Sequence, residues 1–157
     1  MGEDEEFMLL ALKELEKGVK KKQSPFGAVI VCKGKVVSSA HNTVVGDKDP
    51  SAHAELNAIQ AAGKKLKKVH FKGCTIYSTC EPCPMCFSAI HWAGIERIVY
   101  GASIADAEAC GFRELSISNK RMRSLGGAKL EIKGGVLRDE CIKAMKKWKK
   151  RKDKRVY

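Results

Sequence analysis

A pair of cysteines flanked by prolines constrains this chain more than any other feature of its sequence. Cys83 and Cys86 are three residues apart, and Pro82 and Pro84 flank the first of them. Proline is tolerated in the first turn of a helix, so the apolar segment 74–79 is predicted to be a strand that runs directly into a helix. Both thiols then lie near a helix N-terminus, where the helix dipole favours the thiolate that zinc binds.

A histidine and a glutamate occur about thirty residues earlier. His53 is followed two positions later by Glu55. His53, Cys83 and Cys86 make a three-ligand set, and zinc held by three protein groups keeps a fourth position for water and lowers the pKa of that water to about 7. Glu55 need not be a ligand and is the candidate catalytic residue for proton transfer.

The combined pattern, His-x-Glu followed by Pro-Cys-x-x-Cys, is the signature of zinc deaminases that act on bases. At these residues the chain resembles the cytidine deaminase superfamily. The resemblance implies an α/β fold of three layers, α/β/α, with a mixed five-stranded sheet and one Zn²⁺ per chain. It also implies a hydrolase, in which water adds to an amino-bearing ring carbon, Glu55 moves the protons and ammonia leaves.

Two other interpretations of the motif stay open. Cys80 precedes the pair with the same spacing, so Cys80, Cys83 and Cys86 could form a closed Cys₃His structural zinc site with His53. Such a chain would be a zinc-stabilised nucleic-acid-binding domain and not an enzyme. In a metal-free chain, His53 would be a partly buried histidine and Glu55 a surface carboxylate.

Bacterial guanine deaminases are the members that the chain resembles most. The resemblance covers residues 25–114 and depends on four stretches, 41–44, 77–86, 91–93 and 106–112. It implies conversion of guanine and water to xanthine and ammonia by a homodimer, and hence a place in purine metabolism. Cytosine and nucleosides are alternative substrates.

The same resemblance implies substrate-binding residues. Asn42 would hydrogen-bond the base, the backbone of Ala54 would contact its edge, and Phe26 and Trp92 would line the pocket. Glu114 stands where guanine deaminases have Asp, and a carboxylate there would accept from purine N–H groups. Without such roles, the two aromatic residues would be core, Asn42 a turn residue and Glu114 a surface charge.

The C-terminal part differs from guanine deaminases. Residues 135–141 and the Lys-rich helix after them resemble the end of bacterial tRNA adenosine deaminases, although 105–120 does not match that group. A tRNA adenosine deaminase that makes inosine in the anticodon loop is therefore the second candidate, because a basic helix suits an RNA backbone. The last residue, Tyr157, resembles an aromatic tail that closes a neighbouring pocket in guanine deaminases.

Length and charge fit one zinc-binding domain over 1–157 with a basic tail at 143–157. The net charge is +12, and nine Lys or Arg against one Asp lie between 143 and 155. This run could track phosphates or form a solvated helix face. Seven cysteines are an odd number, the N-terminus is acidic and no apolar run approaches about 18 residues, so we expect reduced cysteines, a cytoplasmic location and no membrane span.

Periodicity predicts the main elements. Helices are expected at 7–19, from Ser51 onward, at 119–125 and at 137–150, and strands at 28–32, 36–40, 74–79, 98–100 and 130–132. Residues 44–51 are expected to be a loop, and 101–112 has no clear pattern. His53 is predicted in the first turn of its helix. Residues two apart on a regular helix point about 160° apart, so His53 and Glu55 can share a centre only at an irregular helix start.

Overall fold

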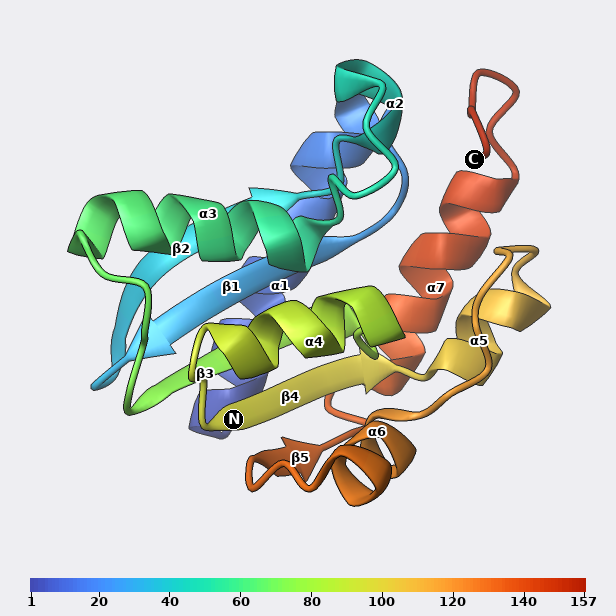
Figure 1. Cartoon of the computed structure of the whole chain (residues 1–157). Helices are drawn as coiled ribbons and strands as arrows, with labels where there is room; N and C mark the ends of the chain where they lie inside the picture. Colours follow the sequence, from blue (N-terminus) through green and yellow to red (C-terminus); the bar gives the residue numbers. More distant parts are fainter.

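A mixed five-stranded sheet forms the centre of the protein in the computed structural model, which describes residues 1–157 (Figure 1). The elements in chain order are α1 (Glu3–Lys20), β1 (Gly27–Cys32), β2 (Lys35–His41), α2 (Val44–Asp47), α3 (Ala54–Leu66), β3 (Cys74–Cys80), α4 (Pro84–Trp92), β4 (Arg97–Ala102), α5 (Ile104–Ala109), α6 (Asn119–Gly126), β5 (Glu131–Lys133) and α7 (Arg138–Lys149). None of these helices combines the length and the apolar character that a membrane span requires.

The strand order is β2-β1-β3-β4-β5. β1 is antiparallel to β2 and to β3, whereas β3, β4 and β5 run parallel. The predicted strand–helix–strand unit is therefore present as β3, α4 and β4. Because β3 ends immediately before α4, the end of a central strand and the start of a helix meet at one edge of the sheet.

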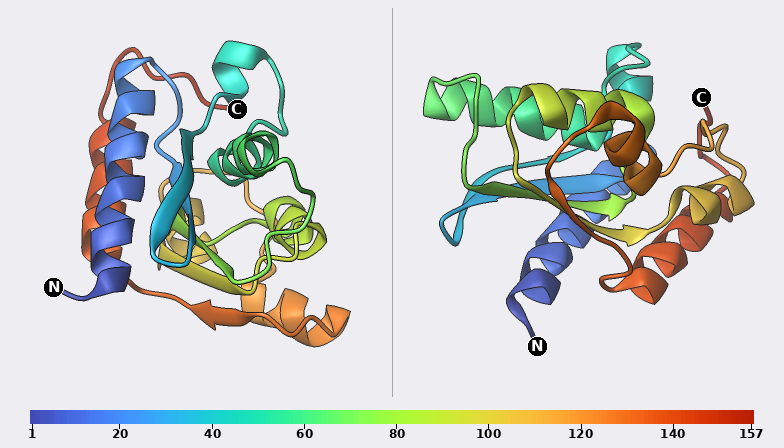
Figure 2. Two further views of the ribbon diagram at one scale, coloured as in Figure 1. Left: turned by 90° about the vertical axis from the view of Figure 1, so that its left-hand side faces the viewer. Right: turned by 60° about the horizontal axis from the view of Figure 1, so that its bottom comes forward.

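Helices cover both faces of the sheet, with α1 and α7 side by side on one face and α3 and α4 on the other (Figure 2). Met8 of α1 and Met145 of α7 belong to one buried cluster, and Ala58 of α3 and Ile90 of α4 belong to the second. A sheet that buries apolar side chains on both faces needs a helical layer on each. The predicted three-layer α/β/α class is confirmed.

The largest differences from the sequence-based prediction lie in three segments. α1 begins at Glu3 because four acidic residues occupy its first turn, where the helix dipole favours negative charge. The segment 44–51, predicted to be a loop, contains the short α2. Residues 101–112, which showed no clear pattern, contain α5, whose start is a capping box between Ser103 and Asp106.

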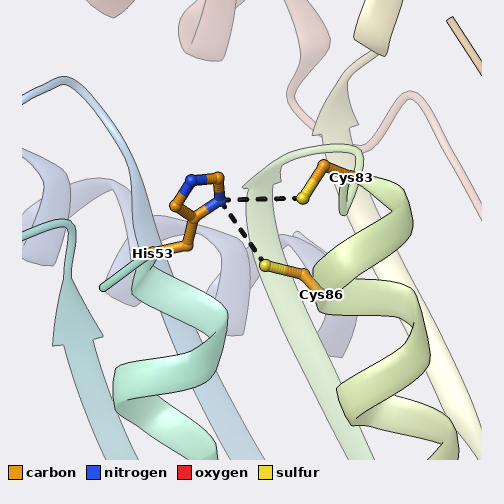
Figure 3. A group of neighbouring side chains, drawn as sticks. All are labelled: His53, Cys83 and Cys86. Atoms are coloured by element: carbon orange, nitrogen blue, oxygen red, sulfur yellow. Dashed lines mark hydrogen bonds between the residues drawn. The ribbon is translucent and has the colours of Figure 1, made fainter. Parts of the chain in front are cut away.

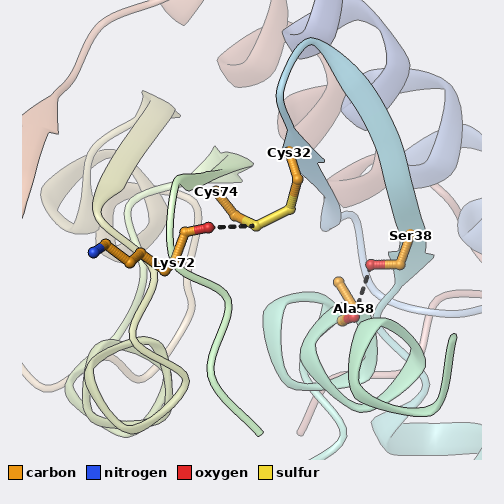
Figure 4. Close-up of a disulfide and its surroundings, with 5 residues drawn as sticks. All are labelled: Cys32, Ser38, Ala58, Lys72 and Cys74. Carbon is orange, nitrogen blue, oxygen red and sulfur yellow. Dashed lines mark hydrogen bonds between the residues drawn. A yellow bond between two sulfur atoms is a disulfide. The ribbon is translucent and has the colours of Figure 1, made fainter. Parts of the chain in front are cut away.

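One pair of cysteines forms a disulfide, Cys32–Cys74 (Figure 4). The prediction that every cysteine outside the metal site is reduced is therefore wrong for these two. Cys32 ends β1 and Cys74 opens β3, and the antiparallel register places them directly opposite each other. Residues that face each other in such a pair lie close together on one side of the sheet. The sequence did not indicate this register between β1 and β3, because the two cysteines are 42 residues apart.

Asp4 in the first turn of α1 joins the helix to three strands. It accepts hydrogen bonds from Arg97 on β4 at 2.7 and 3.0 Å, from Lys133 on β5 at 2.7 Å and from the Tyr77 hydroxyl on β3 at 3.0 Å. The hydrogen bond from Arg97, with those from Lys133 and Tyr77, holds the pKa of Asp4 well below its usual value. A carboxylate with a depressed pKa stabilises the fold when it is ionised.

We expect Asp4→Asn to lower the free energy of unfolding at pH 7 by about 1.5–3 kcal/mol, the range for hydrogen bonds to charged groups. The folded pKa lies below the unfolded value of about 3.9, so this stabilisation is full above about pH 4 and is lost as pH falls further. Urea unfolding at pH 7 and pH 3 measures both effects. Asp139→Asn, which changes a 94 % exposed side chain, is the control. A pH-independent difference, or none, would contradict the account.

Candidate functional site

The three predicted ligands come together where α3 and α4 begin (Figure 3). Nδ1 of His53 lies 3.7 Å from Sγ of Cys83 and 3.6 Å from Sγ of Cys86. The candidate ligand atoms of all three residues lie within 4.8 Å of one another. One imidazole and two thiols at these separations form a group that could hold a metal ion, and the donor types suit zinc.

His53 was predicted in the first turn of its helix. It is instead the N-cap of α3. Its backbone is extended, with φ −69° and ψ 155°, and helical geometry starts at Ala54. Glu55 is the second helical residue. The change from extended to helical backbone between these positions lets both side chains face one centre, which a regular helix would not allow. Ser51, where the helix was predicted to begin, lies two residues before the N-cap position.

On the opposite side, Cys83 is the N-cap of α4, Pro84 occupies the first helical position and Cys86 the third. Proline is favoured at the first position because its missing N–H would have no partner there. The two prolines and two cysteines of the motif therefore specify one local structure, a helix start with both sulfur atoms on the side that faces α3. This agrees with the sequence-based prediction, except that Cys83 lies at the cap.

The two thiols differ in their acidity. The thiol of Cys86 donates to Cys83 and, with His53 beside it, lowers the pKa of Cys83 to about 4. The hydrogen bond that Cys86 makes to Cys83, together with burial, raises the pKa of Cys86 well above its usual value. A second thiolate in this buried site therefore needs a cation beside it. This is what a divalent metal supplies, so the donor set fits zinc.

Glu55 lies next to this group and is 6 % exposed. Its Oε1 accepts a 2.9 Å hydrogen bond from the Ser78 hydroxyl on β3, and its Oε2 lies 3.6 Å from Sγ of Cys86. Burial raises the pKa of Glu55. One oxygen is thus held by the sheet while the other points toward the candidate metal position.

Cys80 does not belong to the group. Its thiol points to the backbone carbonyl of Ser103 at 3.8 Å, and burial raises its pKa well above the usual value. The His53–Cys83–Cys86 group contains three residues, so the chain does not form the closed Cys₃His arrangement. Three protein donors leave room for a non-protein fourth ligand.

A small cavity lies over the group and encloses about 20 Å³, room for about one water molecule. Its lining contains most of the residues predicted for substrate binding or catalysis. The lining residues are Phe26, Asn42, His53, Glu55, Cys80, Glu81, Cys83, Glu114 and Tyr157.

Tyr157, for which the resemblance implied closure of a neighbouring pocket, lines this cavity of its own chain. Its hydroxyl accepts a 2.7 Å hydrogen bond from Nδ2 of Asn42, and its ring centroid lies 6.0 Å from that of His53. Oδ1 of Asn42 accepts from the backbone N–H of Val44 at 3.1 Å, which fixes the orientation of the amide. Asn42 therefore presents its N–H₂ group to the cavity.

Glu114 lies on the loop between α5 and α6 and reaches the same cavity. Burial, with the nearby charge of Cys83, raises the pKa of Glu114 to about 7. On the same side, the ring of Phe26 packs edge-on against Phe112, with centroids 4.8 Å apart. The loop thus brings a further carboxyl group to the space where a substrate would lie.

Two predicted contacts are not brought to the cavity. Ala54 is fully buried at the first position of α3, and Trp92 is 74 % exposed at the end of α4. The sequence-based interpretation also gave no role to Glu81, a buried carboxylate in the cavity wall, or to Ser78. The available signal for Glu81 was its position, because it is a charged residue inside the motif at the end of a predicted strand.

A family model agrees with this geometry. The model described as "Cytidine and deoxycytidylate deaminase zinc-binding region" matches residues 1–102, which contain all three candidate ligands and Glu55. The chain belongs to this family. The zinc cofactor predicted from the motif is confirmed by the family and by the donor group, and family membership implies a hydrolytic deaminase.

Similar proteins include both guanine deaminases and tRNA-specific adenosine deaminases. Guanine deaminase of Bacillus subtilis is 46 % identical over 88 residues, which are 56 % of this chain and 56 % of that protein. The tRNA-specific adenosine deaminase of the same organism is 35 % identical over 90 % of this chain and 85 % of its own length. The structure of guanine deaminase from Nitrosomonas europaea superposes with a TM-score of 0.85 at 28 % identity, covering 92 % of this chain and 84 % of that one.

Proposed function

We propose that residues 1–157 act as one zinc-dependent nucleobase deaminase domain and that guanine is the preferred substrate, giving xanthine and ammonia. The observation that carries the proposal is the position of Glu55, a buried carboxyl group between Ser78 and the His53–Cys83–Cys86 donors. Zinc binding by the three donors does not require a carboxylate at this position, whereas proton transfer during hydrolysis does.

In this proposal His53, Cys83 and Cys86 hold one zinc ion. When bound, zinc supplies a Lewis acid that lowers the pKa of a water molecule. Glu55 accepts a proton from the attacking water through Oε2 and delivers it to a ring nitrogen of the base while the hydroxyl group adds to the amino-bearing carbon. Glu55 then takes the proton of this new hydroxyl group and gives it to the amine, so that the C–N bond breaks, ammonia leaves and a carbonyl remains. Ser78 keeps Oε1 in place, and burial raises the pKa of Glu55, which favours the protonated carboxyl group that can donate to the base.

Two polar side chains favour a purine with both N–H donors and acceptors. The N–H₂ group of Asn42 can donate to a ring acceptor once it separates from Tyr157, and the Glu114 carboxylate can accept from N–H groups. Phe26 supplies an apolar wall. Similarity to the guanine deaminases of Bacillus subtilis and Nitrosomonas europaea supports this choice.

Adenosine in a tRNA is the second candidate, and one observation favours it. Lys143, Lys146, Lys147 and Lys150 line a single concave surface on α7. This spacing of three and four residues places four ammonium groups on one helix face, which can follow a phosphate backbone. The tRNA-specific adenosine deaminase of Bacillus subtilis matches 90 % of this chain, whereas the guanine deaminase of the same organism matches 56 %.

Ammonia release decides between the candidates. The zinc-loaded protein is incubated with guanine, guanosine, cytosine, cytidine and adenine, and an anticodon stem-loop transcript is assayed for inosine. We expect turnover of guanine above every other compound. Turnover confined to the transcript, with binding that weakens steeply as salt increases, would replace guanine by tRNA. No turnover of any of them would contradict the proposed enzyme.

We also propose a homodimer, with the outer face of α4 in the interface. Met85 and Trp92, seven residues apart on this helix, are 39 % and 74 % exposed. Exposed aromatic side chains of this size are enriched in protein–protein interfaces. Trp92→Glu is expected to convert the dimer to a monomer in sedimentation velocity, while Val69→Glu, which changes another exposed apolar residue, is not. A wild-type monomer at micromolar concentration would contradict the proposal.

A further inference from the structure

The turn between β3 and α4 contains a carboxylate that the proposed chemistry does not use. Glu81 is 6 % exposed and lies two residues before Cys83. Its Oε2 accepts a 3.0 Å hydrogen bond from the backbone N–H of Ile104, and its Oε1 accepts a 2.8 Å hydrogen bond from the backbone N–H of Asn119. Both oxygen atoms are therefore engaged by backbone, and neither is directed at a substrate.

These two donors are the first residues of two helices. Ile104 opens α5 and Asn119 opens α6. The first N–H groups of a helix have no partner within it, and the helix dipole favours a negative charge beside them. One carboxylate therefore satisfies the N-termini of two helices at once. The loop between these helices, 110–118, carries Glu114, which lines the cavity. Glu81 is therefore bonded to both ends of the segment 104–119 that contains this loop.

Asn119 returns a bond to the same turn. Its Nδ2 donates to the backbone carbonyl of Pro82 at 2.6 Å, and the residue is fully buried. Oδ1 of Asn119 has no hydrogen-bond partner within the protein. Burying an amide group without hydrogen bonds costs free energy. The bond to Pro82 is the one side-chain hydrogen bond that offsets this cost for Asn119. The carbonyl that it holds belongs to the residue directly before Cys83.

We infer that Glu81 and Asn119 form a positioning pair that locks the Glu81–Pro82 turn, and with it Cys83, to the loop that carries Glu114. The inference rests on the proposed role of Cys83 as a zinc ligand. The N–H of Glu81 also donates to Ala102 at 2.7 Å, so the turn is held from β4 as well as from both helix starts. Groups that orient a metal ligand change metal affinity without contacting the metal.

Asn119→Ala tests the pair because it removes the bond to Pro82 and keeps the backbone N–H that binds Glu81. Zinc affinity is measured by competition with a chelator, and the ligand field is observed from the visible spectrum of the cobalt-substituted protein. We expect zinc affinity to fall by about 10–100-fold, the usual effect of losing an outer partner of a ligand. We also expect the cobalt absorption bands to shift, which a purely global loss of stability would not cause.

Ser118→Ala is the matched control. The Ser118 hydroxyl caps the same helix by accepting from the backbone N–H of Arg121 at 3.2 Å, but it does not touch the turn. This variant should weaken α6 and leave both zinc affinity and the cobalt spectrum unchanged. Glu81→Gln provides a second variant, since its amide N–H₂ would face a backbone N–H, and it should reproduce the spectral shift.

The outcomes separate this inference from the proposed function. If Asn119→Ala and Glu81→Gln bind zinc as tightly as the wild type with the same cobalt spectrum, the positioning pair is wrong while the zinc site stands. An equal loss in Ser118→Ala would also overturn it, because helix stability alone would then explain the effect. If the wild-type protein binds no zinc at His53, Cys83 and Cys86, the proposed function fails first.

Discussion

Glu55→Gln is expected to lower kcat by about 10²–10⁴-fold, the range attributed to a positioned general acid–base group. Glutamine has nearly the same shape and can still accept the 2.9 Å hydrogen bond from Ser78, but it cannot take up or release a proton in the relevant range. Initial rates of ammonia release, with zinc content determined on the same samples, measure the effect. Zinc content should stay at one per chain, because Glu55 is not among the candidate ligands.

The matched control is Glu16→Gln, which makes the same chemical change at an exposed position of α1 and should leave kcat unchanged. Activity close to wild type in Glu55→Gln would remove the proton-transfer role. Loss of zinc from this variant would show instead that Glu55 is a ligand, and the assignment of three protein donors would then be wrong.

Cys83→Ser is expected to reduce zinc affinity by more than the roughly 10–100-fold that follows loss of an outer partner, and to abolish turnover. Serine keeps the size of the side chain but removes the group whose pKa lies at about 4, so the site loses its more readily formed thiolate. The buried Cys86 thiol and His53 would then form a two-ligand set. Zinc content after dialysis against a weak chelator measures the loss.

Cys80→Ser serves as the control for this prediction, because its side chain points to the carbonyl of Ser103 and a hydroxyl can make the same contact. This variant should retain zinc and activity. Zinc loss in Cys80→Ser equal to that in Cys83→Ser would support the closed four-ligand site. Thermal unfolding of both variants, with and without added zinc, shows whether metal binding also stabilises the fold, as linkage requires.

Much of the fold could be predicted from local sequence. The prolines around Cys83 specify a helix start, and the apolar runs at 28–32 and 74–79 specify central strands, because both signals depend on neighbouring residues. The pairing of Cys32 with Cys74 could not be predicted, since it depends on the register between strands separated by 42 residues. The helix α5 was missed because only its capping box marks it.

The residues of the candidate site could also be predicted in part from local sequence. The motif predicted His53, Cys83 and Cys86, and the structure brings them together at two helix starts. The geometry of the site was not predictable, because the extended backbone of His53 depends on how the preceding loop packs. The Glu81 carboxylate accepts from the backbone N–H of Asn119 across 38 residues, and no periodic pattern in the sequence indicates such a contact. The exposure of Trp92 likewise depends on tertiary packing, which local sequence does not encode.

X-ray absorption spectroscopy of the zinc-loaded protein tests the central claim most directly, because it counts the atoms around the metal without relying on a substrate. The account predicts one imidazole nitrogen and two sulfur atoms from His53, Cys83 and Cys86, with one further light atom that comes from solvent. A spectrum with three sulfur atoms, or with the metal saturated by protein atoms, would contradict it.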